Sequence, residues 1–430
     1  MSSIARHIRN EKALPAAVGE ICTPKENGPD ARSLKPGEPL PVEEKIFEHG
    51  RPVSVPEKPG YYHQLLREIY EQPEAVLRTL GNRTADTGRF LQELGMINTA
   101  KNLRRLHIVG CGSSYHAALA GRYIIERFVH IPVGIDMASE YRCMESIVTK
   151  GTLFISISQS GETTDTLEAQ REAKRKGAFT VTICNEEDSA CAREADSVIY
   201  TSAGRERGST STKTFTTQMA ALCLLGIALG IGKERMNPVE GETLSSLLTD
   251  LPCLMKKALD TTEVIREISG ALIHTKECLY FGRGINYPIA LEGALKMKKL
   301  CHIPAEGFAA GEMKHGAGSL IESGVPVVLL APVESLHQKV FSDIAEVKAK
   351  GGRVIAITDA PAALKDTVDH IVSIPSTHPA FFPFVSVIPL QLLAYHLAVA
   401  KGYNSYLNGN QVESQPECRP STIEPPGHFI

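Results

Sequence analysis

Apolar and polar positions in this chain are grouped into blocks that predict strands followed by helices. Short runs rich in Val, Ile, Leu and Phe are typical of buried strands. The strand-like runs are RLHIVG (105–110), LFISIS (153–158), FTVTIC (179–184), SVIYTS (197–202), ECLYFGRG (277–284), VPVVLLAP (325–332), RVIAITD (353–359) and HIVSIP (370–375).

Longer segments between these runs place apolar residues three or four positions apart, which is typical of helices. They lie at 114–129, 169–177, 214–229, 287–300, 337–352 and 386–402. Strands that alternate with helices predict an α/β fold in which parallel sheets are covered by helices. Glycine loops follow the first strand of each half, at 111–115 and at 282–287, roughly 170 residues apart. The repeated order predicts an internal duplication.

The remaining segments predict the domain boundaries. Residues 1–59 are rich in Pro, Gly, Glu and Lys and predict a mostly disordered tail. Residues 60–98 predict a helical linker of two helices that separate at Pro73. The two α/β domains are then expected at 99–250 and 251–402, and residues 403–430 are expected to form an irregular C-terminal tail.

Composition narrows the classes of partner and the cellular compartment. The net charge is -3 and the two signs are interspersed, so neither nucleic acid nor a membrane surface is expected as a partner. The longest apolar run, 219–232, is short and contains glycines, which favours a packed helix over a membrane span. The 10 cysteines are scattered without a Cys-x-x-Cys pair, and the N-terminus resembles no secretory leader, so we expect free thiols in the cytoplasm.

The loop Ser158-Gln159-Ser160-Gly161-Glu162-Thr163-Thr164 carries the first candidate chemistry. It follows a strand and precedes a helix, whose free N–H groups and dipole attract anions. This pattern predicts binding of a small phosphorylated molecule, since the chain has neither a Walker lysine motif nor a complete dinucleotide fingerprint. The alternative is that these hydroxyls only cap the helix and its turn. The histidine spacing indicates no metal site, and no cofactor is expected.

Several longer motifs resemble one known family. They are CGSSYHAAL, ASEYR, ISQSGETTDTL, GSTSTKTFTTQ, GRGINYPIALEGALKMK, AEGFAAGEMKHG and LQLLAYHLAVAKG. Together they resemble the isomerase part of glucosamine-6-phosphate synthase, from about residue 60 to residue 402. The resemblance implies two sugar isomerase (SIS) domains, each a flavodoxin-like three-layer sandwich around a parallel sheet.

The resemblance also implies roles for particular residues. Ser114, Ser158, Gln159, Ser160 and Thr163 match the residues that hold the phosphate of a hexose 6-phosphate, with Ser113 beside them. His315 matches the histidine that opens the sugar ring and can come from a neighbouring subunit, which implies a homodimer or larger assembly. Glu292 matches a glutamate of the sugar site. Lys296, one turn later, matches a site lysine, but the two residues could equally form an ordinary helix ion pair.

The chain departs from the family at residues that carry catalysis. Lys299 stands where the family has the glutamate that moves a proton between C1 and C2 of the sugar. Arg419 falls, in a loose alignment, where the family has a lysine that forms an imine, and Ser209 and Thr210 replace apolar residues near the ammonia path. Only about 59 residues precede the SIS part, so glutamine is not expected to supply nitrogen within this chain.

These features leave several functions open. An enzyme of this kind could interconvert fructose 6-phosphate and glucosamine 6-phosphate with free ammonia, work as a deaminase, or only isomerise the sugar. A separate glutaminase chain could also supply nitrogen, docking near residues 60–73. The base could be Glu292, Glu306 or an uncharged Lys299. A non-catalytic regulator that binds sugar phosphates is the alternative from another class.

Overall fold

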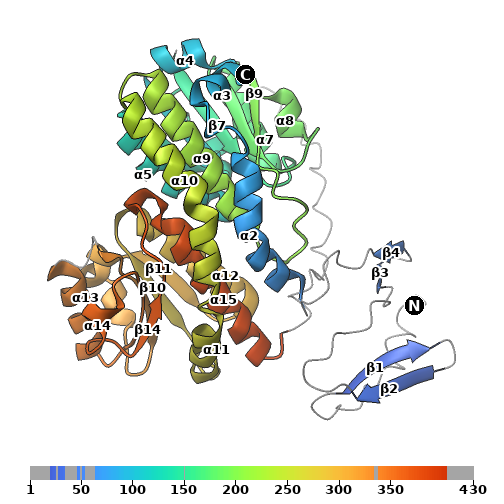
Figure 1. The fold of residues 1–430 in the computed structure, drawn as a ribbon, viewed down its shortest axis with the longest axis vertical. Coiled ribbons are helices and arrows are strands. Elements are labelled where there is room, and N and C mark those ends of the chain that lie inside the picture. Colours follow the sequence, from blue (N-terminus) through green and yellow to red (C-terminus); the bar gives the residue numbers. More distant parts are fainter. Residues whose placement is uncertain are drawn as a thin grey trace, which may run out of the picture. The chain divides into compact units, whose positions relative to one another are not determined.

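The computed structural model describes residues 20–25, 28–33, 46–48, 51–53, 63–149, 151–333 and 338–403 (Figure 1). The chain divides into two compact units, Met1–Tyr62 and His63–Ile430. The predicted C-terminal tail, including Arg419, lies outside the described residues.

The first unit contains two short hairpins. Antiparallel pairs join β1 (Glu20–Lys25) to β2 (Gly28–Ser33) and β3 (Ile46–Glu48) to β4 (Arg51–Val53). The sequence predicted a mostly disordered tail over residues 1–59 and did not predict these four short strands. Each hairpin joins strands that are close in sequence. The strands are short and carry prolines and scattered charged residues, so they show no clear alternation of apolar and polar positions. The rest of the predicted tail lies outside the described residues.

The first α/β domain is built on a five-stranded parallel sheet in the order β6-β5-β7-β8-β9. Its strands are β5 (Arg105–Gly110), β6 (Val133–Met137), β7 (Thr152–Ile157), β8 (Phe179–Cys184) and β9 (Ser197–Tyr200). Its helices are α5 (Ser113–Val129), α6 (Ala138–Cys143), α7 (Thr164–Arg175), α8 (Ala190–Glu194) and α9 (Lys213–Gly232).

The second domain repeats this topology, with a five-stranded parallel sheet in the order β11-β10-β12-β13-β14. Its strands are β10 (Cys278–Gly282), β11 (Ala305–Ala309), β12 (Pro326–Leu330), β13 (Arg353–Thr358) and β14 (His370–Ser373). Its helical segments are η1 (Gly284–Asn286), α12 (Tyr287–Cys301), η2 (Ala310–His315), η3 (Ala317–Leu320), α13 (Gln338–Ala349), α14 (Pro361–Leu364), η5 (Pro379–Phe381) and α15 (Phe382–Ala400). Both sheets therefore have the doubly wound order 2-1-3-4-5, and the predicted duplicated α/β fold is confirmed.

One hydrophobic cluster extends through both α/β domains. Helices α5, α9, α12 and α15 contribute to it together with α2 (Gln64–Leu80), α10 (Pro238–Leu259) and the buried strand residues beneath them. Short helices α3 (Thr87–Glu93), α4 (Ile97–Asn102) and α11 (Thr262–Ala271) complete the described elements. Two helical segments, Lys213–Gly232 and Pro379–Ala400, are long and apolar enough to cross a membrane, but both are 89% buried, as core helices are.

Two details of the helical and strand predictions differ in the structure. Residue Pro73 does not split the linker: α2 runs through it from Gln64 to Leu80. A proline leaves the carbonyl four residues earlier without its helical donor, and here the side-chain Nε2 of Gln72 donates to that oxygen, on Ile69, at 2.9 Å. The edge strands β6 (VGIDM) and β11 (AEGFA) were not predicted, because each contains Gly and an acidic residue and pairs on one side only.

Candidate functional site

A polar pocket of about 190 Å³ lies at the carboxyl end of the first sheet, between the loops that follow β5 and β7. The pocket is lined by Cys111, Ser114, Ile157, Ser158, Gln159, Ser160 and Thr163. Five of these are residues that the sequence proposed as phosphate ligands. Ligands of doubly wound sheets bind at this edge, where strands lead into helix N-termini.

Hydrogen bonds within the loop after β7 fix the orientation of its hydroxyls. The Oγ of Ser158 accepts from the N–H of Gly161 at 3.0 Å and lies 3.0 Å from the Oγ1 of Thr163. The Oγ of Ser160 accepts from the N–H of Glu162 at 3.2 Å. Thr163 is the N-cap residue of α7, but its side chain makes no capping hydrogen bond. The hydroxyls of Ser158 and Ser160 thus shape the turn, whereas that of Thr163 does not cap the helix.

Gly161 is the residue that allows this tight turn. Its φ of +63° lies in the left-handed region, and a Cβ atom at this position would lie 2.0 Å from the Oγ of Ser189. Both the backbone conformation and the close approach of the α8 segment therefore require glycine. Any larger residue must displace the loop that lines the pocket.

Helix α12 of the second domain crosses α5 beside this pocket. The Nδ1 of His116 lies 2.7 Å from the Oε2 of Glu292, and the Nζ of Lys296 donates to the Oγ of Ser113 at 3.0 Å. The contacts pair an earlier residue of α12 with a later residue of α5, so the C-terminal end of α12 lies toward the N-terminus of α5. Lys299 is three residues beyond Lys296, a rise of about 4.5 Å along the helix. It extends the stripe formed by Glu292 and Lys296 at the end of α12 nearest the pocket.

Glu292 and Lys296 are both fully buried and form an ion pair with each other. Burial alone would raise the pKa of Glu292, but the charge of Lys296 and the hydrogen bond from His116 outweigh it and lower the pKa to about 2. The carboxylate is thus ionised at neutral pH, and both of its oxygens have partners. Such a group is a weak proton acceptor.

Lys299 has a different environment from Lys296, because its side chain is exposed. Partial desolvation and the like charge of Lys296 lower the pKa of Lys299, while the carboxylates of Glu292 and Glu206 oppose this shift. A lowered pKa increases the uncharged fraction of this amine at neutral pH.

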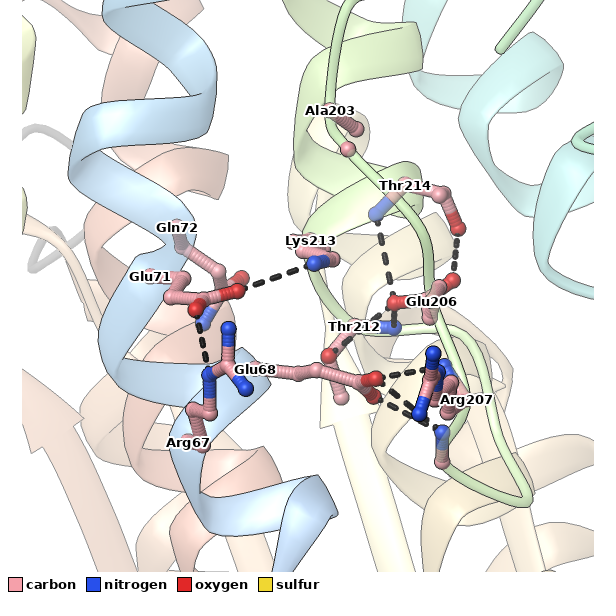
Figure 2. Close-up of polar contacts among 12 residues, drawn as sticks. Arg67, Glu68, Glu71, Gln72, Ala203, Glu206, Arg207, Thr212, Lys213 and Thr214 are labelled. Carbon is pink, nitrogen blue, oxygen red and sulfur yellow. Dashed lines mark hydrogen bonds and ion pairs between the residues drawn. The ribbon is translucent and has the colours of Figure 1, made fainter. Parts of the chain in front are cut away.

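A second polar network lies between α2 and the loop that leaves β9 (Figure 2). The carboxylate of Glu206 in this loop accepts from the N–H of Thr212 at 2.7 Å and from the hydroxyl of Thr214. Glu71 on α2 forms an ion pair with Lys213 at 2.9 Å. Glu206 therefore ties its loop, residues 203–212, to the start of α9, and Glu71 ties the start of α9 to the linker helix.

The remaining residues that the sequence singled out do not line the pocket. His315 ends η2, is exposed, and is not among the pocket-lining residues. Glu306 is exposed on β11. The hydroxyl oxygens of Ser209 and Thr210 are buried and have no hydrogen-bond partner within the described ranges.

Sequence reasoning missed three residues of this region, namely Cys111, His116 and Glu206. Cys111 and His116 stand within the CGSSYHAAL motif. Glu206 lies two residues before the GSTSTK motif and seven residues before its lysine, Lys213. The pattern gave no sign that His116 pairs with Glu292, because that contact joins residues 176 positions apart.

Comparison with known proteins places this geometry in a family. Residues 101–228 and 271–401 each match the SIS domain. The chain therefore belongs to the SIS domain family, of which it contains two copies. A similar solved structure is the C-terminal domain of glucosamine-fructose-6-phosphate aminotransferase from Francisella tularensis, with a TM-score of 0.76 and 37% sequence identity. The match covers 80% of the present chain and 98% of the Francisella chain.

Two curated relatives are similar over the same region. The glutamine–fructose-6-phosphate aminotransferase (isomerizing) of Caldanaerobacter subterraneus is 41% identical over 366 residues, and that of Bradyrhizobium diazoefficiens is 42% identical over 365 residues. Each match covers 84% of this chain and 60% of the relative. The chain thus spans about three fifths of the length of these relatives.

Proposed function

We propose that this chain binds a hexose 6-phosphate or hexosamine 6-phosphate and interconverts fructose 6-phosphate and glucosamine 6-phosphate. The observation that carries the proposal is the pocket at the edge of the first sheet, where Ser114, Ser158, Gln159, Ser160 and Thr163 converge. Hydroxyls, an amide and the free N–H groups at the start of α7 suit a dianionic phosphate. The similarity to aminotransferases that act on fructose 6-phosphate supports the same substrate class.

Among the candidate bases, the environment favours Lys299. Transfer of a proton between C1 and C2 needs a group that is uncharged or anionic near neutral pH and accessible to the sugar. Glu292 is fully buried and held by two partners. Glu306 is accessible, but it lies on the edge strand β11 of the second sheet and not on the stripe of α12 that carries Lys296. The lowered pKa and the exposure of Lys299 suit the role better.

Ring opening is assigned to His315 from a second copy of the chain. His315 is exposed and is not among the residues that line the pocket, so this proposal takes the histidine from a neighbouring subunit. An imidazole is the side chain suited to moving the ring-oxygen proton near neutral pH. The assembly is therefore a homodimer or larger.

The nitrogen source and compartment complete the proposal. Free ammonia or a separate glutaminase chain would supply nitrogen to the synthase, and the reverse reaction would be deamination. Co-purification from the native host should recover a glutaminase if a second chain is used.

Eight free cysteines in the described ranges suit a reducing compartment such as the cytoplasm.

One assay tests the activity directly. The protein is incubated with fructose 6-phosphate and ammonium, and separately with glucosamine 6-phosphate, and both sugars are followed over time. Turnover in either direction supports the enzyme, and Lys299→Gln should reduce it at least about 10-fold. Absence of turnover in both directions, with an intact dimer, would contradict the enzymatic proposal.

A sugar-phosphate sensor is the second candidate. Two observations favour it: the family glutamate is replaced by Lys299, and Glu292 is engaged by His116 and Lys296. A sensor would bind fructose 6-phosphate saturably without converting it. Gain of isomerase activity in Lys299→Glu would then show that this replacement removed the base.

A further inference from the structure

Glu68 of α2 reaches across to the loop 203–212 (Figure 2). Its side chain is only 2% exposed. The Oε1 atom accepts from the backbone N–H of Arg207 at 2.5 Å and of Gly208 at 3.1 Å, and Oε2 lies 3.0 Å from the same Gly208 nitrogen. One carboxylate therefore holds two consecutive peptide groups of the loop.

The two ends of this loop are held by other groups. At its start, the Oδ1 of Asn185 accepts from the N–H of Ala203 at 2.8 Å, and the Nδ2 of Asn185 donates to the oxygen of Gly204 at 3.1 Å. At its end, Glu206 accepts from the N–H of Thr212. Glu68 supplies the attachment in the middle of the loop, and it comes from a helix that precedes the first SIS domain.

The loop is connected to the region of the pocket through two of its contacts. Asn185, which holds its start, also donates its backbone N–H to the oxygen of Gln159 at 3.0 Å, and Gln159 lines the pocket. The charge of Glu206 acts on Lys299, at the end of α12. A shift of the loop 203–212 would therefore affect both the loop 158–163, through Asn185 and Gln159, and the electrostatic environment of Lys299, the amine proposed as the base.

We propose that Glu68 is a positioning residue of this site, which holds the loop 203–212 in place through the peptide groups of Arg207 and Gly208. The role for catalysis rests on the proposed function, whereas the role in holding the loop does not. The linker helix α2 is then part of the site and not only a connection.

The proton on Glu68 affects this attachment. Burial, reinforced by the like charge of Glu206, raises the pKa of Glu68 to about 7, although the two backbone N–H groups and the charge of Lys213 oppose the shift. On α2 itself, Glu71 pairs with Arg67 and Lys213, and the side facing α15 presents Gln72, bonded to Gln391. A raised carboxyl pKa means that the held loop binds the proton more tightly than a released, solvated Glu68 would. By linkage, protonation stabilises the held loop, and the attachment weakens as the pH rises through about 7.

Limited trypsin digestion tests the attachment, because Arg205 and Arg207 lie within the loop. Wild type, Glu68→Gln, Glu68→Ala and the exposed control Glu242→Gln are digested between pH 6 and 8.5, and each rate is divided by that of Glu68→Gln at the same pH. The permanently neutral amide keeps an acceptor oxygen, so this ratio removes the pH dependence of trypsin.

The proposal predicts three results. Glu68→Ala is cleaved in the loop about 10-fold faster than wild type at pH 6, the loss expected for one buried hydrogen-bonded anchor. The wild-type ratio rises at least about threefold between pH 6 and 8.5. In a further variant, Glu206→Gln, the rise occurs at lower pH, because the like charge that raises the pKa of Glu68 is absent. A wild-type ratio that stays constant, or loop cleavage of Glu68→Ala at the wild-type rate, would overturn the attachment.

Calorimetric titration with fructose 6-phosphate separates this proposal from the proposed function. If wild type binds, Glu68→Ala should bind about 10-fold more weakly, with Glu68→Gln and Glu242→Gln close to wild type. Equal affinity in Glu68→Ala with a released loop would remove Glu68 from the site. If wild type binds no sugar phosphate, the proposed function fails, while the digestion still decides whether Glu68 holds the loop. Thermal unfolding of each variant confirms that the fold is retained.

Discussion

The Nδ1 of His116 in the first SIS domain lies 2.7 Å from the Oε2 of Glu292 in the second. One turn further along α12, Lys296 reaches Ser113 at the start of α5. These contacts connect the domains through a buried polar ladder that ends beside the phosphate loop. Three of these four residues, Ser113, Glu292 and Lys296, were proposed from the sequence for the sugar site, and their contacts also join the two domains.

Removing one partner of the buried ion pair Glu292–Lys296 should destabilise the fold more than removing both partners. Glu292→Gln leaves the Lys296 ammonium buried without a counter-charge and should lower the free energy of unfolding by about 3–5 kcal/mol. Glu292→Gln with Lys296→Met removes both charges and should recover more than half of that loss. Urea denaturation of the two variants and wild type measures both. Equal losses in the single and double variants would contradict the ion-pair account.

The pH dependence of stability should carry the signature of Glu292. Its folded pKa, about 2, lies below its ordinary value of 4.5, so its contribution is complete above pH 4.5 and is lost as the pH falls toward 2. We expect a contribution of about 3 kcal/mol that disappears across this range. Urea denaturation from pH 3 to 7 should show a shallower slope for the variant Glu292→Gln with Lys296→Met. A slope equal to that of wild type would contradict the assignment.

The hydroxyls of the phosphate loop should control affinity and not the fold. Ser158→Ala removes one hydroxyl of the pocket, and loss of a hydrogen bond to a charged phosphate costs about 1.5–3 kcal/mol, or roughly 10- to 100-fold in Kd. Calorimetry with fructose 6-phosphate measures the change. Ser246→Ala, on the exposed face of α10, is the matched control and should bind as wild type does. Equal affinities of Ser158→Ala and Ser246→Ala for fructose 6-phosphate would contradict a role of the Ser158 hydroxyl in phosphate binding.

Gly161 should be irreplaceable in the same loop. In Gly161→Ala the added methyl meets the Oγ of Ser189 and the residue must keep φ at +63°, so the loop has to move. We expect binding of fructose 6-phosphate to fall at least about 10-fold, while the far-UV circular dichroism stays that of wild type. Gly177→Ala, where an added Cβ would meet nothing within 4 Å, controls for the left-handed backbone alone. Similar losses of affinity in both variants would show that the contact with Ser189 is unimportant.

Local patterns in the sequence were sufficient to predict the polar turn after β7 and the buried strands. The run FTVTIC, for example, predicted β8 with its observed bounds, because alternation of Phe, Val and Ile with the β-branched Thr is typical of a strand. The residues of the loop 158–163 are neighbours in sequence, and so their common pocket follows from one turn.

Contacts between distant residues could not be predicted in the same way. Lys296 and Ser113 are 183 positions apart, and Glu68 and Gly208 are 140 apart, so only the packing of α12 on α5 and of α2 on the loop brings them together. At Pro73 the prediction failed for a local reason. Its general effect on helices predicted a break, but the Gln72 side chain compensates locally for the missing donor.

Isothermal titration calorimetry with fructose 6-phosphate and with unphosphorylated fructose is the most direct test of the central claim, that the loop after β7 binds a sugar phosphate. We predict saturable binding of fructose 6-phosphate, no detectable binding of fructose, and loss of the signal when Ser158 and Ser160 are both replaced by alanine. Heat of binding that is equal for the two sugars, or unchanged in the double variant, would contradict the account.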